Sequence, residues 1–213
     1  MRFLDSLRTI NRDKQPKSMV VYLLEMGENL LCQQFESTLV DFFYGGFMRY
    51  GQIRKYDVAN GPGIRTSFFV TGCHANCKNC FNKEYMDPNF GNLWTDEQTQ
   101  EIISYLKKDE IEGLTILGGE PFESTEDLIK IVKKIRGESD KSIWIFSGFL
   151  YEILVNIENA KKLLSMCDVL VDGLFVEELK DLRLKFKGSS NQRTIDIQKS
   201  LENKKVILLD GYN

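Results

Sequence analysis

Short apolar runs and amphipathic stretches alternate along the chain from about residue 48 to its end. Five runs rich in β-branched and aromatic residues predict buried strands. They lie at residues 65–72, 113–119, 142–148, 168–173 and 205–211. Before residue 48 the apolar clusters follow no clear pattern, although a helix over about 28–43 is consistent with the sequence.

Amphipathic stretches between the runs predict helices. TDEQ at residues 95–98 is typical of a helix cap, and STED at residues 124–127 opens another helix. An apolar stripe at helical spacing follows each of them. The stripes consist of Ile102, Ile103 and Leu106, and of Leu128, Ile131, Val132 and Ile135. Helical residues follow again to about residue 165, with a break near Asn156.

The order of these elements predicts an α/β fold with parallel strands joined by right-handed helical crossovers. Residues 48–213 are too few for eight complete β/α units, which take about 250 residues. A partial, open (β/α) barrel or an open sheet is therefore expected. We divide the chain into an N-terminal extension of unknown role, residues 1–47, and one domain, residues 48–213.

Composition excludes several classes of protein. The 213 residues are 42% apolar and carry a net charge of −3, so no basic surface suggests nucleic acid binding. No apolar run reaches the roughly 18 residues of a membrane helix, and the first residues lack the pattern of a signal peptide. We expect a cytoplasmic protein whose five cysteines are mostly reduced.

Three of those cysteines stand close together in VTGCHANCKNCFN, residues 70–82. Cys73, Cys77 and Cys80 lack an obvious fourth ligand for structural zinc, because the single histidine, His74, is the neighbour of Cys73. A disulfide would leave one thiol over. An iron–sulfur cluster accepts thiolates from such a loop, and three of them leave one iron open for chemistry. The loop follows a predicted strand, where parallel β/α folds bind ligands.

The spacing Cys-x3-Cys-x2-Cys resembles the cluster motif of the radical S-adenosylmethionine (radical SAM) enzymes. LGGEP, residues 117–121, is similar to the segment that holds the methionine end of S-adenosylmethionine in that family. The resemblance implies a [4Fe–4S] cluster on the three cysteines, and S-adenosylmethionine as the second cofactor. It implies no catalytic side chain, because the cofactors carry the chemistry. The expected cofactor-binding residues are Asn79, Cys80, Phe81, Gly118, Gly119, Glu120 and Ser147.

Two further segments narrow the resemblance. NGPGIRTSFFVTGC, residues 60–73, resembles the activating enzymes of glycyl-radical proteins, and residues 171–193, which contain GSSNQR, resemble those that serve anaerobic ribonucleoside-triphosphate reductase. The implied partners are the large subunit of that reductase and flavodoxin or a similar low-potential electron donor. An activase of the pyruvate formate-lyase type and a zinc-binding module without enzymatic activity remain as alternatives.

Other residues receive structural interpretations. Tyr56 and Asp57 are expected to fix the entry of a strand, and Cys32 and Cys167 to be buried apolar thiols. The polar segment from Asp172 to Arg193 is expected on the cluster side of the sheet, where it would help to present the reductase glycine.

Overall fold

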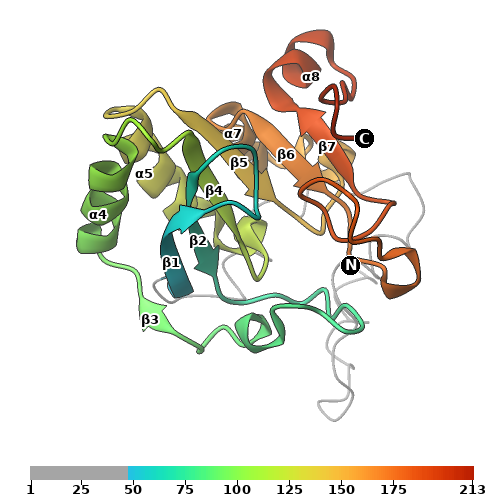
Figure 1. Cartoon of the computed structure of the whole chain (residues 1–213), viewed down its shortest axis with the longest axis horizontal. Coiled ribbons are helices and arrows are strands. Elements are labelled where there is room, and N and C mark those ends of the chain that lie inside the picture. Colours follow the sequence, from blue (N-terminus) through green and yellow to red (C-terminus); the bar gives the residue numbers. More distant parts are fainter. Residues whose placement is uncertain (1–47) are drawn as a thin grey trace, which may run out of the picture.

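The computed structural model describes residues 48–213, which form a mixed α/β fold around one seven-stranded sheet (Figure 1). The strand order is β3-β1-β2-β4-β5-β6-β7, so the sheet is open. Its four central strands, β2, β4, β5 and β6, run parallel, and the outer pairs are antiparallel. The strands are β1 (Arg49–Asp57), β2 (Arg65–Val70), β3 (Asn92–Leu93), β4 (Gly113–Gly118), β5 (Ser142–Phe146), β6 (Val169–Asp172) and β7 (Arg193–Asp196).

Helices α4, α5 and α7 pack against one face of the sheet (Figure 1). The α-helices are α4 (Asp96–Leu106), α5 (Thr125–Arg136), α6 (Tyr151–Leu154), α7 (Glu158–Ser165) and α8 (Ile197–Asn203). Short 3-10 helices are η1 (Lys83–Met86), η2 (Pro121–Ser124) and η3 (Glu177–Leu179). None of the helices within residues 48–213 combines the length and apolar character that crossing a membrane requires.

The central strands are buried on both faces, as expected of a parallel sheet. On β5, Ile143 and Ile145 belong to the large core under the helices. Trp144 between them belongs to a smaller cluster with Val169 and Val171 of β6, and C-terminal side chains such as Tyr212 pack on this cluster. The sequence prediction of four parallel strands joined by helices is confirmed.

The predicted helix signals are also confirmed. Thr95 and Gln98 form a reciprocal capping box at the start of α4. Every residue of the two predicted apolar stripes is buried. The break expected near Asn156 separates α6 from α7.

The predicted strand at 205–211 is wrong. Only Leu208 forms an isolated bridge, to Ile195 of β7, so no ladder develops. Val206 packs on the large core and Leu209 on the Trp144 cluster, while Leu208 stays 46% exposed. The run is apolar because it covers two different clusters. The expected helix over 28–43 and Cys32 lie outside the described residues.

The sequence prediction missed the antiparallel strands β1, β3 and β7. Strand β1 is mostly half-buried and carries several charged residues, so it lacks a continuous apolar run. Strand β3 has only two residues and β7 only four. Strands β1 and β7 pair with the buried strands β2 and β6, and β3 pairs in turn with β1.

The glycine-rich turn before β2 has a packing role. Arg65 is 1% exposed, and its guanidinium donates hydrogen bonds to Thr115 and Ser142, under the amino ends of β4 and β5. A Cβ on Gly61 would approach Arg65 Cδ to 2.5 Å. Asp57 accepts hydrogen bonds from the turn, which confirms that it fixes this entry to the sheet.

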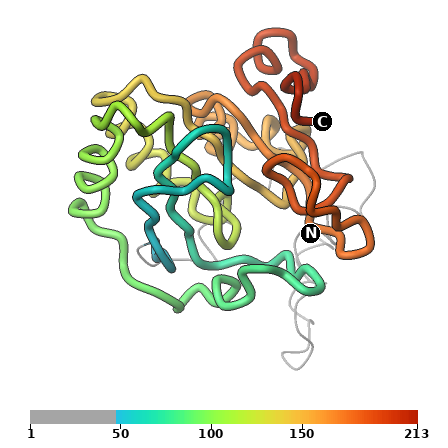
Figure 2. Tube along the Cα trace, viewed as in Figure 1, coloured from blue at the N-terminus to red at the C-terminus, as the bar shows by residue number. Residues whose placement is uncertain are grey.

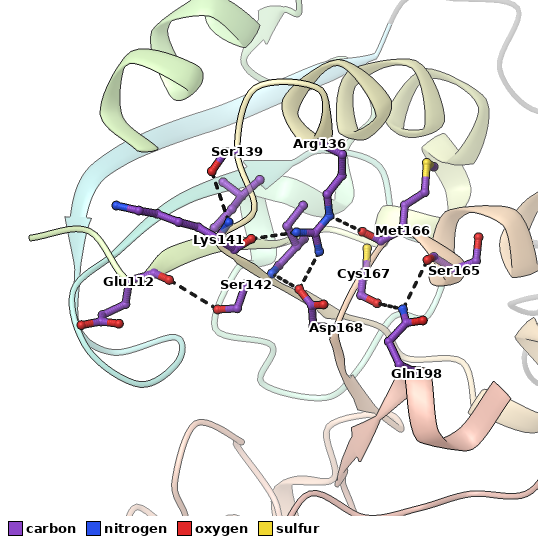
Figure 3. Close-up of polar contacts among 12 residues, drawn as sticks. Glu112, Arg136, Ser139, Lys141, Ser142, Ser165, Met166, Cys167, Asp168 and Gln198 are labelled. Atoms are coloured by element: carbon purple, nitrogen blue, oxygen red, sulfur yellow. Dashed lines mark hydrogen bonds and ion pairs between the residues drawn. The ribbon is translucent and has the colours of Figure 1, made fainter. Parts of the chain in front are cut away.

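A second polar cluster closes the amino ends of the parallel strands (Figure 3). Arg136, at the end of α5, pairs with Asp168 and donates to the carbonyls of Lys141 and Met166. Asp168 also accepts from the backbone N–H of Ile143. Because parallel α/β sheets bind ligands at the opposite end, we assign this cluster a structural role.

Candidate functional site

The carboxyl ends of the four parallel strands bring the predicted site residues together. Each strand ends in a turn that contains glycine: Gly72 follows β2, Gly119 follows β4, Gly148 follows β5 and Gly173 follows β6. The loop after β2 runs along this edge of the sheet and meets the loop that follows β6 (Figure 2). The fold therefore gathers four segments that are far apart in the sequence.

The cysteine loop, residues 71–82, carries Cys73, Cys77 and Cys80 as free, half-buried thiols. Asn76 and Asn79 adopt positive φ angles of 47° and 55°, a conformation that asparagine tolerates better than most residues. Burial raises the pKa of Cys73 and of Cys77, so these thiols need a positive partner to ionise at neutral pH.

No three His, Cys, Asp or Glu side chains are placed to hold a metal ion within residues 48–213. The fit to an iron–sulfur cluster rests instead on the chemistry of the donors. Three thiols share one loop, and none of them is in a disulfide. Thiolates are the ligands that such clusters require, so the residues present suit the group.

The turn after β4 packs tightly against the cysteine loop. The backbone N–H of Glu120 donates to the carbonyl of Gly72 at 2.8 Å, and that of Gly119 donates to Val70 at 2.8 Å. A Cβ on Gly119 would lie 2.4 Å from the Gly72 oxygen. Gly118 has φ +118°, and a Cβ there would meet Val70. The two glycines thus allow two backbones to approach each other.

Glu120 joins the ends of β4 and β5. Its carboxylate is 3% exposed and accepts three hydrogen bonds, from the N–H groups of Phe122 and Gly148 and from Ser147 Oγ. Burial raises the pKa of Glu120 to about 8, although these donors favour the ionised form. Ser147 Oγ in turn accepts from the N–H of Phe149 at 2.9 Å. Glu120 and Ser147 therefore link the turn after β4 to the turn after β5.

Glu123 contacts the cysteine loop, although no sequence pattern predicts a role for it. Its carboxylate accepts from the backbone N–H of His74 at 3.0 Å and lies 2.9 Å from His74 Nδ1. This contact holds the loop beside Cys73. The carboxylate raises the pKa of His74. The position of Glu123, three residues after Glu120, gave no local signal of such a contact.

Three of the expected cofactor-binding residues, Asn79, Cys80 and Phe81, lie at the end of the cysteine loop. Cys80 donates its backbone N–H to the carbonyl of Cys77 at 3.2 Å, which closes a turn through Asn79. The ring of Phe81 is 63% exposed and lies 5.2 Å from that of Phe175. The structure therefore places Phe81 between the cysteine loop and the loop after β6.

The loop after β6 forms one side of the site. We call residues 173–180 the wall segment. Besides the Phe81–Phe175 ring contact, Lys78 pairs with Glu178 at 3.0 Å, and Lys180 lies 4.8 Å from the centre of the Phe81 ring. The wall segment thus lies beside the cysteine loop, on the side of the sheet where the polar segment was expected.

The GSSNQR residues make contacts within the chain. Asn191 donates to the Leu174 carbonyl at 2.8 Å, and Gln192 donates to the Gly173 carbonyl at 2.9 Å. Arg193 pairs with Asp172, which is fully buried, and with Glu152. These contacts give Asn191 and Arg193 a bracing role within the chain, and the expected role of this segment in presenting the reductase glycine stays a prediction.

Comparison with known proteins identifies the family. Residues 59–195 match the family described as "4Fe-4S single cluster domain". The protein named anaerobic ribonucleoside-triphosphate reductase-activating protein from Escherichia coli (strain K12) is 38% identical over 152 residues, covering 68% of this chain and 96% of the relative. Its namesake in Enterobacteria phage T4 is 34% identical over 149 residues, covering 68% and 92%. The chain therefore belongs to the family of anaerobic ribonucleoside-triphosphate reductase-activating proteins.

Proposed function

We propose that this chain is a radical SAM activase that generates a glycyl radical on anaerobic ribonucleoside-triphosphate reductase. One observation carries the proposal: three free thiols share the loop after β2, and the Gly118-Gly119-Glu120 turn packs directly against that loop. This juxtaposition lies at the carboxyl ends of parallel strands in an open sheet, where β/α folds bind ligands, and it supports a partial barrel of the radical SAM type. The names of the relatives support the choice of reductase over pyruvate formate-lyase.

Cys73, Cys77 and Cys80 would hold a [4Fe–4S] cluster through their thiolates. A bound cluster would supply the one electron needed for reductive cleavage of S-adenosylmethionine to methionine and a 5′-deoxyadenosyl group, which would be the acceptor of a hydrogen atom from a glycine of the reductase. The role of the chain is to bind, to orient and to exclude water. The partial burial of the three thiols suits this role.

The methionine end of S-adenosylmethionine would bind at the turn after β4. In this proposal Gly118 and Gly119 offer backbone groups, while Glu120 and Ser147 keep the turns after β4 and β5 in register. The adenine end would lie near Asn79, Cys80 and Phe81. Since the ring of Phe81 is largely exposed, it has a face available for a planar ligand.

The proposed partners are the large subunit of the reductase and flavodoxin or a similar low-potential donor. The names of the relatives support the choice of the reductase as partner. The choice of donor rests on the need for one electron at low potential. A cytoplasmic location, expected from cysteine usage, completes the proposal.

The test compares single cysteine variants after anaerobic reconstitution with iron and sulfide. We expect Cys73→Ala, Cys77→Ala and Cys80→Ala to lose the site-differentiated cluster and the production of 5′-deoxyadenosine. Cys167→Ala is the control, because this thiol is fully buried in the large core. About four irons per wild-type chain support the proposal, as expected for a cubane. One zinc in place of iron, or wild-type cleavage by Cys77→Ala, would refute it.

A further inference from the structure

The face of the sheet opposite the helices carries an arginine near the proposed site. Phe68 and Val70 of β2 belong to the large core under the helices, whereas Phe69 between them does not. Successive side chains of a strand point to opposite faces, so Phe69 lies on the helix-free face. The guanidinium of Arg54, on the neighbouring strand β1, lies 4.6 Å from the centre of the Phe69 ring. Arg54 therefore lies over the helix-free face of the sheet.

Arg54 is connected to the cysteine loop through Gln52 and Tyr85. Arg54 Nε donates to Gln52 Oε1 at 3.0 Å, and Gln52 Nε2 donates to the hydroxyl oxygen of Tyr85 at 2.6 Å. The ring of Tyr85 also packs against Phe69, with 5.8 Å between the ring centres. The Tyr85 carbonyl accepts from the backbone N–H of Gly72, in the cysteine loop, at 2.8 Å. These contacts link the guanidinium to the loop that carries the three thiols.

The guanidinium has hydrogen-bond donors that the described part of the chain does not use. Its side chain is 43% exposed, and Nη1 lies 3.8 Å from Asp57 Oδ2, beyond hydrogen-bond distance. Within residues 48–213 neither Nη atom makes a hydrogen bond. The Phe69 ring and the bond to Gln52 hold the plane of the group, so its two Nη atoms are pre-organised for a ligand with oxygen acceptors.

The register of β1 places Arg54 below the strand ends. Arg54 pairs with Ser67, three residues before β2 ends at Val70. At about 3.3 Å per residue, the two positions are roughly 10 Å apart along the strand. The cofactors are proposed to bind at the turns that follow the strand ends. A ligand that contacts Arg54 would therefore lie next to the cofactors, as the proposed reaction requires of its second substrate.

We propose that Arg54 binds the backbone of the reductase segment that carries the glycine. The inference rests on the proposed function and assigns a binding residue for its protein substrate. Glycine has no side chain, so it can be recognised only through its own backbone and that of its neighbours. A guanidinium supplies several donors in one plane and suits carbonyl oxygens along such a backbone. Gln52 acts through Arg54 and is a positioning residue.

The first test uses the full chain without iron, and the large subunit of anaerobic ribonucleoside-triphosphate reductase as the probe. In a calorimetric titration the dissociation constant should be about tenfold higher for Arg54→Ala, because a lost hydrogen bond from a charged donor changes an equilibrium by about that factor or more. Arg54→Lys keeps the charge without the planar fork and should lie between the two. Lys107→Ala is the control, since this exposed cation pairs with Glu138 at the end of α4. Equal affinities of Arg54→Ala and wild type would overturn the proposal, as would a wild-type chain without affinity for the reductase.

A double-mutant cycle tests the role of Gln52 in the same titration. Gln52→Ala should weaken binding of the reductase several-fold when Arg54 is present, because the guanidinium then loses the acceptor that orients it. The same change should have no further effect in Arg54→Ala. Additive effects of the two substitutions would show that Gln52 does not act through Arg54.

The second test uses the reconstituted protein with its cluster. In Arg54→Ala the KM for the reductase should rise about tenfold, while the dissociation constant of S-adenosylmethionine keeps its wild-type value. A saturating concentration of reductase should restore most of the rate of glycyl radical formation, because the change removes binding energy rather than a chemical group. Weaker binding of S-adenosylmethionine in Arg54→Ala would place Arg54 in the cofactor site and overturn the proposal.

Failure of the proposed function and failure of this inference give different results. A wild-type protein that binds no four-iron cluster refutes the proposed function, and the assignment of Arg54 falls with it. A wild-type protein that carries its cluster and forms the glycyl radical, with an unchanged KM for the reductase in Arg54→Ala, leaves the proposed function standing and overturns only the inference.

Discussion

Gly119 lies so close to Gly72 that a Cβ on Gly119 would stand 2.4 Å from the Gly72 oxygen. The carbonyl carbon of Gly72 would be 3.0 Å away, and the Tyr85 oxygen 2.8 Å. All of these atoms are backbone, which yields less readily than a side chain. The turn after β4 and the cysteine loop are therefore coupled through a contact that only glycine permits.

Gly119→Ala should consequently damage the cysteine loop itself. We expect a reduced yield of bound iron and lower thermal stability, because the added methyl group forces the two backbones apart. Gly137→Ala is the control, since its Cβ would meet nothing closer than 3.4 Å. Full iron content in Gly119→Ala would contradict this coupling.

Ser147→Ala tests the link between the turns after β4 and β5. The change removes a donor to Glu120, while the amides of Phe122 and Gly148 remain. We expect a loss of about 1–3 kcal/mol in the free energy of unfolding, the usual cost of leaving buried polar groups without partners. Weaker binding of S-adenosylmethionine should accompany it in an anaerobic titration. Ser165→Ala is the exposed control, and a Ser147 variant with unchanged stability and affinity would refute the link.

Asp57 gives the fold a defined pH dependence. Burial opposes its ionisation, but hydrogen bonds from Ser67, Asn60 and Ala59 more than compensate and lower the pKa of Asp57 below its usual value. Because the folded-state pKa lies below the unfolded one, the stabilisation is present at neutral pH and is lost as the pH falls below about 4.

Asp57→Asn should therefore reduce the free energy of unfolding by about 1–3 kcal/mol at pH 7. The difference from wild type should shrink as the pH is lowered, which denaturant titrations between neutral and acidic pH would measure. A difference that is constant over this range would show that Asp57 does not contribute through its charge.

The domain boundary predicts that a chain beginning at Met48 folds and cleaves S-adenosylmethionine. Met48 is buried, its backbone N–H donates to Asp127 at 3.2 Å, and its carbonyl accepts from Trp94 at 2.8 Å. The shortened chain thus keeps these contacts. We expect equal iron content and cleavage rate in the two chains, whereas failure of the shorter one to assemble a cluster would make residues 1–47 part of the domain.

The sequence predicted the features that depend on local pattern. Buried parallel strands appear as continuous apolar runs, and a capping box such as that of Thr95 and Gln98 spans four residues. The three cysteines also share one loop. Each of these signals is complete within a short window, so a single sequence suffices to read it.

The remaining features depend on contacts between distant segments. Lys78 and Glu178 are separated by 100 positions, and nothing near either residue indicates the pair. The contact of Gly119 with the cysteine loop joins segments almost 50 positions apart, Gly72 and Gly119, and no local pattern indicates it. Likewise, the polar GSSNQR run has the composition of a surface loop, and only the fold shows that its side chains bind the wall segment.

The most direct test of the whole account is electron paramagnetic resonance of the reconstituted protein mixed anaerobically with S-adenosylmethionine, a low-potential reductant and anaerobic ribonucleoside-triphosphate reductase. We predict a glycyl radical signal on the reductase and formation of 5′-deoxyadenosine, both absent when Cys77→Ala replaces the wild-type protein. A wild-type protein that carries its cluster, yet gives neither the radical nor 5′-deoxyadenosine, would contradict the account.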